Sequence, residues 1–507
     1  MTSVTTTNPA TGEVRTLPFT ETIDAQVLAL CERAHAALED FSTRPLVWRA
    51  GLLRAMAEEL EADAPTLVAL AHEETALPLA RLEGELRRTA FQLRFFADVV
   101  TDGSFLDATI DHATESPMGA LPDLRRMRIA LGAVGVFGSS NFPFAFSVPG
   151  GDTASALAAG CPVVIKAHPA HPATSAAAFA ALERGAKRCE APEGVLNLLF
   201  GLSAGTALVQ ASPISAIGFT GSVAAGRALW ALANARDAPI PFFGELGSAN
   251  PLVVTPSACD ERAEEIGAGF AGSMTLGAGQ FCTKPGLLFV PTGSRGDALV
   301  AAIVTALEAA TPFTMLTSGI AEHFRSGSAA IAASGDTRSL VARHDSAGAQ
   351  AVAQLFEVDA EQFALDHARV LRDECFGPLA VVVRYDSDAT LRDALGASAP
   401  SLTFSLFCAE HDEGAQWLLD AAAQRAGRVI VNGFPTGVAV SWSMQHGGPW
   451  PSTTSSASTS VGAGAIERWL RPVTYQSVPD DLLPAALRDA NPSDVPRRVD
   501  GDWTRER

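Results

Sequence analysis

Short apolar runs that alternate with helix-like stretches constrain this chain of 507 residues more than any other feature. In the first half, the apolar runs lie at 133–137, 162–166, 195–200 and 216–220, and the helix-like stretches at 153–159, 174–185 and 223–234. Strands that are apolar on both faces and joined by helices are typical of a parallel sheet covered by helices. The pattern resumes at 250–431, and the length suits several domains, so we expect two α/β domains.

Three other segments differ from this pattern. Residues 21–101 show helical periodicity interrupted by Pro45 and Pro65, which predicts three or four amphipathic helices. The segment 451–464 is rich in Ser, Thr and Gly, and its composition fits a flexible linker and an ordered loop equally well. The tail from Pro479 is rich in Pro and Asp, and we expect it to lie along the surface.

The composition argues against several classes of partner. A formal net charge of -19 is unsuited to nucleic acid, and the densest basic cluster, residues 125–128, is short. Residues 1–5 are polar, so we expect no secretory signal, and no apolar run is long enough to span a membrane. The seven cysteines are scattered, and the chain has neither a CxxC pair nor an HExxH motif. We therefore expect reduced thiols, a cytoplasmic protein and no metal.

One cysteine lies among glycines, in the run Gly279-Gln280-Phe281-Cys282-Thr283-Lys284-Pro285-Gly286. Glycines permit a tight turn and let the backbone approach a ligand closely. Cys282 is therefore a candidate nucleophile at the mouth of a cleft. A buried structural cysteine is the alternative, because cysteines are among the most buried residues.

Three further motifs place polar groups beside glycines or strand ends. Glu245 is flanked by glycines and is a candidate general base, whereas an isolated Glu is more often solvated surface. Asn141 follows an apolar strand and is a neutral donor suited to an oxyanion, although Asn is also common in turns. Ser222 suits the N-cap of a helix whose start either binds phosphate or is only a structural turn.

In combination the motifs resemble those of the aldehyde dehydrogenase superfamily over essentially the full chain. Six occur in the family's order and approximate spacing, and their residue ranges are 136–143, 163–166, 218–222, 244–247, 279–282 and 374–378. The resemblance implies two doubly wound α/β domains with parallel sheets and a small oligomerisation element. It implies a dinucleotide-binding domain at 1–118 and 139–247, a catalytic domain at 248–445, and a bridging element at 119–138 and 465–490. We accordingly expect a homodimer or homotetramer.

The resemblance also assigns roles to residues. Cys282 is the nucleophile, Asn141 and the backbone N–H of Cys282 bind the oxyanion, and Glu245 is the general base. The residues implied for the cofactor are Lys166 and Glu374 at the two riboses, Gly221 and Ser222 at the pyrophosphate, and Phe376 near the nicotinamide. The thiolate adds to a small-molecule aldehyde, oxidation leaves a thioester, and Glu245 activates water. Acyl transfer to coenzyme A is the less favoured alternative, because members that perform it generally lack this carboxylate.

Several stretches resemble a narrower branch, the NADP-preferring 2,5-dioxopentanoate (2-oxoglutarate semialdehyde) dehydrogenases and the bacterial NADP-dependent fatty-aldehyde dehydrogenase. These stretches are 73–78, 84–89, 150–157, 166–172, 281–286 and 471–476. The branch implies oxidation of 2,5-dioxopentanoate to 2-oxoglutarate, with a broad range of fatty or aromatic aldehydes as the alternative. The chain departs from the branch at 452–458, where its residues are all uncharged.

The charge at the position three residues after the motif lysine bears on the cofactor preference. Family members that use NAD commonly carry a Glu three residues after the motif lysine, where it binds the ribose 2′-OH and repels a 2′-phosphate. That position is Pro169 in this chain, and the adjacent His168 is a candidate donor to the phosphate. We therefore expect NADP, with NAD as a tolerated alternative.

The resemblance gives weaker indications for the aldehyde side of the site. His446, in Gln445-His446-Gly447-Gly448-Pro449, matches a histidine near the active site in this branch, with an ordinary loop histidine as the alternative. The candidates for the wall of the aldehyde tunnel are Phe142, Phe146, Phe434 and Trp442, with packing in the core as their alternative role. Such a wall would favour apolar or flat substrates.

Overall fold

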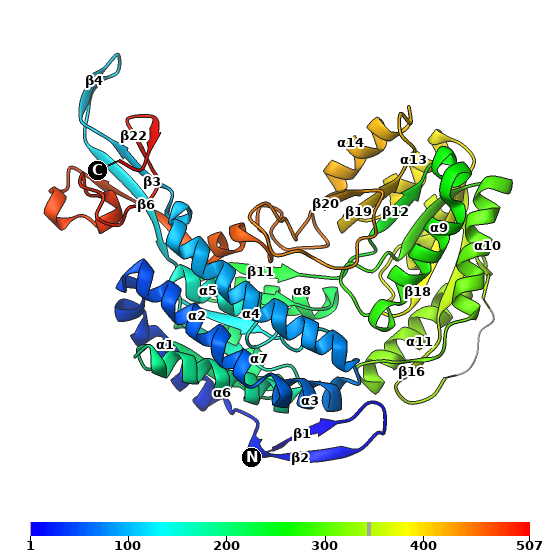
Figure 1. Cartoon of the computed structure of the whole chain (residues 1–507), viewed down its shortest axis with the longest axis horizontal. Coiled ribbons are helices and arrows are strands. Elements are labelled where there is room, and N and C mark those ends of the chain that lie inside the picture. The colour runs from blue at the N-terminus through cyan, green and yellow to red at the C-terminus, as the bar shows by residue number, and fades with distance from the viewer. Residues whose placement is uncertain (1, 342–345, 507) are drawn as a thin grey trace.

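Two parallel sheets, one in each half of the chain, organise the computed structural model, which describes residues 2–341 and 346–506 (Figure 1). The first sheet has the order β11-β10-β7-β8-β9, and every neighbouring pair is parallel. Its strands are β7 (Ala133–Phe137), β8 (Val163–Lys166), β9 (Leu196–Leu199), β10 (Ile214–Thr220) and β11 (Phe242–Glu245). All residues of β7 and β8 are buried, as their unbroken apolar runs predicted.

Helices surround this first sheet. Those that follow its strands are α5 (Gly151–Ala159), α6 (Pro172–Arg188), α7 (Leu202–Gln210) and α8 (Val223–Asn234). The N-terminal region supplies α1 (Asp24–Thr43), α2 (Leu46–Ala62), α3 (Ala64–Thr75) and α4 (Leu79–Asp102), after a hairpin of β1 (Ser3–Thr7) and β2 (Val14–Thr20). The prediction of three or four amphipathic helices at 21–101 is therefore confirmed. Among the described residues, no helix combines the length and apolar character needed to cross a membrane.

The second sheet has the order β15-β17-β18-β13-β12-β19-β20 and is parallel except at β15. Its strands are β12 (Pro251–Val254), β13 (Leu287–Pro291), β15 (Arg338–Ser339), β17 (Gln354–Asp359), β18 (Leu379–Tyr385), β19 (Ser401–Phe407) and β20 (Ala426–Val431). Its helices are α9 (Pro256–Thr275), α10 (Ser294–Glu308), α11 (Ser318–Ala332), α12 (Ala360–Ala364), α13 (Asp388–Ala397) and α14 (Ala415–Arg425), and β14 (Phe313–Thr314) pairs with β16 (Gln350–Ala351). The predicted second α/β region thus contains one continuous sheet.

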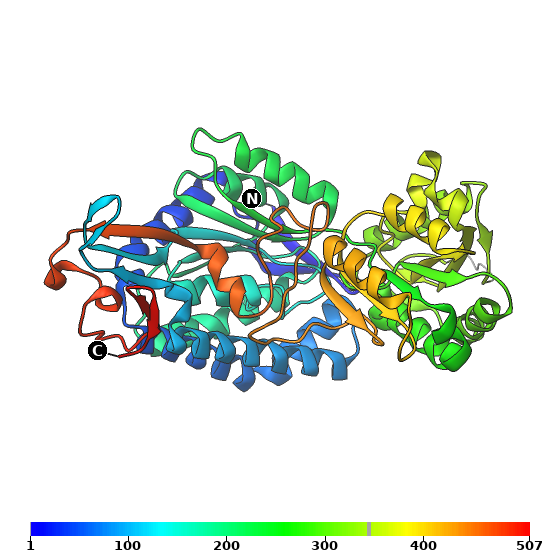
Figure 2. The same ribbon diagram turned by 90° about the horizontal axis from the view of Figure 1, so that it is seen from above.

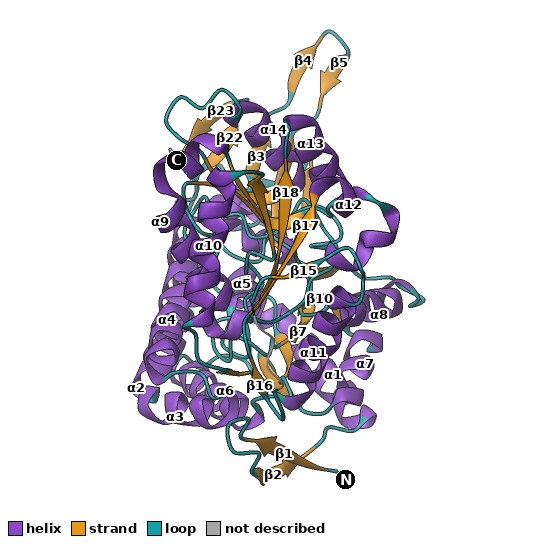
Figure 3. Ribbon diagram, turned by 90° about the vertical axis from the view of Figure 1, so that its right-hand side faces the viewer, coloured by secondary structure: helices purple, strands orange, loops and turns teal. Residues whose placement is uncertain are grey.

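A third sheet, of order β21-β6-β3-β22-β23, lies at one end of the molecule beside a protruding hairpin (Figure 3). Its strands are β3 (Ala108–Asp111), β6 (Leu124–Ala130), β21 (Leu470–Gln476), β22 (Arg497–Val499) and β23 (Asp502–Thr504), and the hairpin is β4 (Thr114–Ser116) with β5 (Gly119–Leu121). The expected bridging range 119–138 differs from the structure at β7, which lies in the first sheet between two parallel neighbours. The tail also contributes strands to the third sheet, because β22 pairs with β3.

The segment after β20 returns from the second half of the chain and lies along β11 (Figures 1 and 2). The N–H of Leu246 donates to the carbonyl of Ser452 at 2.8 Å, and the N–H of Thr454 donates to the carbonyl of Gly244 at 3.0 Å. Glu245 and Thr453 form an antiparallel bridge between these bonds. Of the two alternatives for 451–464, the structure shows the ordered loop, which covers the edge of the first sheet.

Candidate active site

Cys282 lies on the turn between α9 and β13, where three consecutive left-handed residues, two of them glycines, reverse the chain. Gly277, Ala278 and Gly279 all have positive φ, and Gly279 has φ +66°. A Cβ on Gly279 would lie 2.3 Å from the backbone of Gly377, so only glycine fits this contact. The close approach that the glycines predicted is therefore made to another backbone segment, and it leaves Cys282 half-buried on the turn.

The buried side chain of Asn250 holds this turn in place. Its Nδ2 donates to the carbonyl oxygens of Cys282 at 2.7 Å and Lys284 at 3.0 Å. Its Oδ1 accepts hydrogen bonds from Ser248 and from the backbone and hydroxyl of Thr403 on β19. In the sequence, Asn250 is only the first residue of the second α/β region. Its role in the turn is not visible there, because it depends on contacts with residues that are distant along the chain.

Four side chains from three separate segments meet at the nucleophile. The Sγ of Cys282 lies 3.5 Å from Nε2 of His446, and that nitrogen lies 3.0 Å from Oε1 of Glu245. The hydroxyl of Ser460 donates to Oε2 of the same carboxylate. Glu245 and His446 are buried, with 4% and 0% of their surface exposed. The structure thus brings His446, which the sequence left open, into direct contact with Cys282 and Glu245.

This environment determines the ionisation of Glu245 and Cys282. Burial would raise the pKa of the Glu245 carboxyl, but His446 and hydrogen bonds from His446, Ser460 and Cys282 hold it below its ordinary value. Burial, followed by the charge of Glu245, raises the pKa of the Cys282 thiol well above its ordinary value. The resting pair is therefore a thiol beside a carboxylate, and the carboxylate can accept the thiol proton.

The proton on Nε2 of His446 is assigned from its neighbour. A carboxylate is only an acceptor, so the Nε2 that faces Glu245 carries a proton. The Nδ1 atom is buried without a hydrogen-bond partner among the described residues. His446 thus supports the charge of Glu245 by donating to it.

Asn141 lies on the other side of the nucleophile turn. Its Nδ2 donates to the carbonyl of Gln280 at 3.0 Å, two residues before Cys282, and the residue is 7% exposed. An amide nitrogen carries two hydrogens, so this bond leaves one for an oxyanion. The arrangement suits the oxyanion role that the resemblance implied.

Two of the four aromatic candidates gather at this site. Phe142 lies 5.2 Å from Phe146 and 5.1 Å from Phe281, and Phe146 lies 6.3 Å from the His446 ring, all between ring centres. The other two candidates make different contacts: Phe434 packs on Phe407 and over Gly269 of α9, and Trp442 packs on Phe95 of α4. Phe142 and Phe146 therefore line the approach to Cys282, whereas the described ring contacts of Phe434 and Trp442 lie elsewhere.

Lys166, expected at a ribose of the cofactor, ends β8, and Gly221 and Ser222, expected at the pyrophosphate, follow β10. Burial lowers the pKa of the Lys166 ammonium to about 8, and Glu21 opposes this shift. Ser222 is the N-cap of α8, where its Oγ accepts from the N–H of Ala225 at 3.3 Å, and Gly221 and Ser222 are both exposed. The accessible N-terminus of α8 suits the phosphates of a dinucleotide.

Glu374 and Phe376 lie in the segment before β18. Glu374 lies against Gly247, where an added Cβ would stand 2.4 Å from its Oε2. Burial raises the pKa of the Glu374 carboxyl to about 7, although Lys284 and the N–H of Ser248 act in the opposite direction. Phe376 is half-buried. A carboxyl group of this kind can donate to or accept from a ribose hydroxyl.

The same active-site cluster offers metal-ligand chemistry. The thiol of Cys282, the carboxylate of Glu245 and the imidazole of His446 lie within 4.8 Å of one another, and all three groups are ligands that Zn²⁺ accepts. A thiol bound to a cation would not be free to add to an aldehyde. The expectation of a site without metal therefore stays a prediction.

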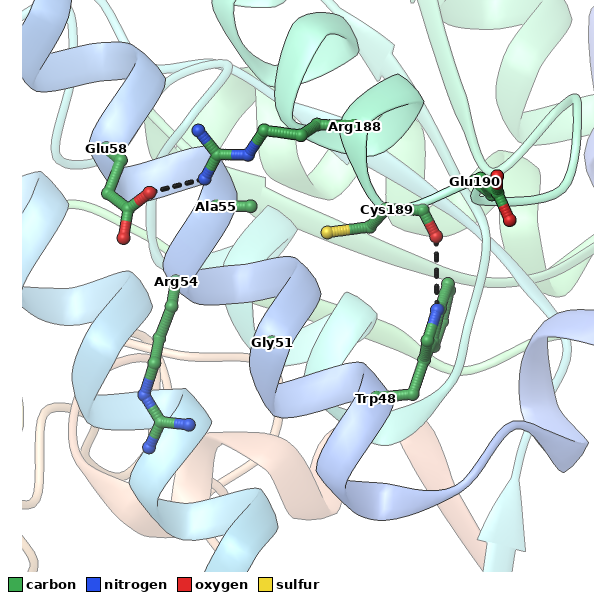
Figure 4. Close-up of a pocket in the computed structure, with 8 residues that line it drawn as sticks. All are labelled: Trp48, Gly51, Arg54, Ala55, Glu58, Arg188, Cys189 and Glu190. Atoms are coloured by element: carbon green, nitrogen blue, oxygen red, sulfur yellow. Dashed lines mark hydrogen bonds and ion pairs between the residues drawn. The ribbon is translucent and has the colours of Figure 1, made fainter.

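A surface hollow of about 450 Å³ lies between α2 and the end of α6, and none of the residues above lines it (Figure 4). Its polar groups bind one another: the indole N–H of Trp48 donates to the carbonyl of Cys189 at 3.1 Å, and Arg188 pairs with Glu58. These contacts leave the hollow without the convergent polar groups that orient a ligand. It is therefore not a second candidate site.

Residues 1–473 match the model of the aldehyde dehydrogenase family. The chain belongs to this family. It is 45% identical to alpha-ketoglutaric semialdehyde dehydrogenase 2 of Azospirillum brasilense, over 97% of this chain and 95% of that relative. It is 42% identical to alpha-ketoglutaric semialdehyde dehydrogenase of Acinetobacter baylyi, over 90% of this chain and 87% of the relative.

The fold of this aldehyde dehydrogenase is shared with a solved 1-pyrroline-5-carboxylate dehydrogenase. The TM-score is 0.78 at 19% identity, over 93% of this chain and 89% of that one. The predicted family and fold class are thus confirmed, and the protein is an oxidoreductase that acts on aldehydes. The family uses NAD(P).

We predict that Ser460→Ala shifts the acid limb of the pH profile of kcat to higher pH. Removing the Ser460 hydroxyl takes away a donor that stabilises the charged carboxylate, so the pKa of Glu245 rises. The base is then lost at a higher pH as the solution is acidified. Ser456→Ala, an exposed serine of the same loop, is the matched control. An unchanged acid limb in Ser460→Ala would contradict the assignment of Glu245 as the titrating base.

Proposed function

We propose that this aldehyde dehydrogenase oxidises 2,5-dioxopentanoate to 2-oxoglutarate through a thioester on Cys282. The cluster of the Cys282 thiol, His446 and the Glu245 carboxylate carries the chemical part of the proposal. The names of the relatives in Azospirillum brasilense and Acinetobacter baylyi support the substrate. The aromatic wall at Phe142 and Phe146 favours the second candidate, a broad range of fatty or aromatic aldehydes.

In the first half of the reaction, Cys282 transfers its proton to Glu245 and its sulfur attacks the aldehyde carbon, which gives a thiohemiacetal. The oxyanion that forms accepts hydrogen bonds from Nδ2 of Asn141 and the N–H of Cys282. Lys166, Ser222 and Glu374 would hold the cofactor, whose nicotinamide, when bound, supplies the two-electron oxidation that leaves a thioester on Cys282.

In the second half, Glu245 acts on water. Once the carboxylate has released the thiol proton, it takes a proton from a water molecule as that water attacks the thioester carbon. The C–S bond breaks, the acid leaves, and the cysteine regains its proton. Because a carboxylate is present for this step, release needs no coenzyme A, and acyl transfer remains the less favoured alternative.

NADP is the cofactor that we propose. Pro169 is exposed beside β8 and brings no negative charge to the ribose. Burial, His171 and Lys166 lower the pKa of His168 well below its ordinary value, so the ring is neutral. Its Nδ1 accepts from the N–H of Ala170 at 3.1 Å, which places the proton on Nε2 as a donor for a 2′-phosphate.

We also propose a cytoplasmic homodimer or homotetramer. All seven cysteines are free thiols, which supports a reducing compartment. The hairpin of β4 and β5 protrudes from the molecule (Figure 3), and its tip exposes Met118 by 92%. An edge strand, β21, and an apolar tip are surfaces that a second copy can cover.

Steady-state kinetics of the wild-type protein test the substrate. With NADP, we expect kcat/KM for 2,5-dioxopentanoate to exceed the values for a long-chain aldehyde and for benzaldehyde. Acid should form at the same rate with and without coenzyme A. Higher kcat/KM for either uncharged aldehyde would contradict the proposed substrate and favour the second candidate.

The cofactor proposal predicts the effect of Pro169→Glu. A carboxylate at this position repels the 2′-phosphate, so the ratio of kcat/KM with NADP to that with NAD should fall about tenfold or more. Pro169→Gln, which changes the backbone in the same way without charge, should keep the ratio near the wild-type value. A wild-type enzyme that already prefers NAD would overturn the NADP proposal, as would a ratio unaffected by Pro169→Glu.

A further inference from the structure

Two arginines of α4 lie against the aromatic residues beside Cys282. The guanidinium carbon of Arg88 is 5.4 Å from the ring centre of Phe146, and that of Arg81 is 4.9 Å from the ring centre of Phe281. Both side chains are half-buried. In the described part of the chain, no carboxylate oxygen lies within 4.0 Å of either guanidinium.

The contacts of Arg88 are with neutral groups only. Its Nε and one terminal nitrogen donate to the carbonyl of Val438 at 3.4 and 3.2 Å, and the other nitrogen donates to the amide oxygen of Gln92 at 3.2 Å. Desolvation lowers its pKa, and Glu85, Cys282 and Glu245 act in the opposite direction. Phe146, which this guanidinium contacts, has its ring centre 6.3 Å from that of His446. A half-buried guanidinium without an anionic partner is a ready site for a carboxylate.

A third arginine approaches the same segment from the catalytic domain. Arg428 of β20 donates to the carbonyls of Gly437, at 2.8 Å, and Pro435, whereas Arg88 binds Val438 from the cofactor domain. Desolvation also lowers the pKa of Arg428, and Cys282 opposes this shift. The two arginines therefore bind neighbouring carbonyls of the segment 435–438, Arg428 from β20 and Arg88 from α4.

The local carboxylates are bound to groups other than these arginines. Glu85 lies on the same face of α4, and its Oε1 accepts the N–H groups of Phe144 and Ala145, at 2.8 and 3.0 Å. Glu245 is bound to His446 and Ser460. Neither carboxylate therefore pairs directly with Arg88. A guanidinium without such a pair, beside the aromatic residues next to Cys282, favours an anionic substrate.

We propose that Arg88, assisted by Arg428 on the same segment, binds a carboxylate at the far end of the aldehyde substrate. The aldehyde end then lies at Cys282, and the chain between them lies along Phe146. The inference rests on the proposed function and adds the residues that select an acidic semialdehyde over an uncharged aldehyde. Arg88 is a specificity-determining residue in this account, because the fork of an arginine matches a carboxylate and an uncharged aldehyde gives it no partner.

The test compares Arg88→Met with wild type on 2,5-dioxopentanoate and on pentanal, with NADP. The ratio of kcat/KM for 2,5-dioxopentanoate to that for pentanal should fall on the order of 10- to 150-fold, which corresponds to the loss of one hydrogen-bonded charge pair. Most of the loss should appear in KM, because the carboxylate is bound equally in the ground and transition states. The ratio for Arg88→Lys should lie between the ratio for Arg88→Met and that for wild type.

Arg87→Met is the matched control, because Arg87 is the next residue of α4 and is exposed. Its substrate ratio should equal that of wild type. An unchanged ratio in Arg88→Met, or equal losses on both aldehydes, would contradict the proposed role of Arg88 in binding the substrate carboxylate. Neither result would contradict the proposed substrate. A wild-type preference for pentanal would instead contradict the proposed function itself. If Arg88→Met folds poorly, the ratio of kcat/KM for the two aldehydes is measured in Arg428→Met and Arg88→Lys instead. A wild-type ratio in both variants would contradict the proposed binding of the substrate carboxylate.

Discussion

The buried carboxylate of Glu245 is the interaction on which the rest of the site depends. An ionised carboxylate that lacks hydrogen-bond donors costs several kcal/mol to bury. The structure supplies these donors from His446 and Ser460, on the segment that returns from the second sheet. That segment also pairs with the backbone of β11 on both sides of Glu245, so the order of the loop and the charge of the base depend on each other.

The nucleophile is held by a different set of contacts. Asn250 binds the carbonyls of Cys282 and Lys284 from the beginning of the second sheet, and Gly279 packs on the backbone of Gly377. Glu245 is thus positioned by the edge of the first sheet and Cys282 by the second sheet. Their relative position depends on the junction between β11 and β12, which explains why the polar residues of this junction are buried and bonded.

The sequence predicted the elements whose signal is local. The strand β7 and the helix α8 have the predicted bounds, because an unbroken apolar run and a Ser222 N-cap are visible within a few residues. Cys282, Glu245 and Asn141 were identified from glycine and strand-end patterns and from the family resemblance, and the structure places them together. His446 was identified only from the resemblance, with a loop histidine as the alternative.

Other features were not predictable, because they depend on contacts between distant residues. The hydrogen bond from Ser460 to Glu245 spans 215 positions, and the composition of 451–464 is that of a linker. Its order comes from pairing with the edge strand β11, which composition does not encode. Arg88 was likewise one charged residue of an amphipathic helix, and only packing against Phe146 shows that it faces the site.

Mass spectrometry of the Glu245→Gln protein tests the central claim most directly. The variant is mixed with aldehyde and NADP and quenched, and peptides that contain each of the seven cysteines are examined for an acyl group. If Cys282 is the nucleophile and Glu245 the base of hydrolysis, the thioester accumulates on the Cys282 peptide, and only when cofactor is present. An acyl group on another cysteine would contradict the account, as would steady turnover at the wild-type rate with no acyl group on Cys282.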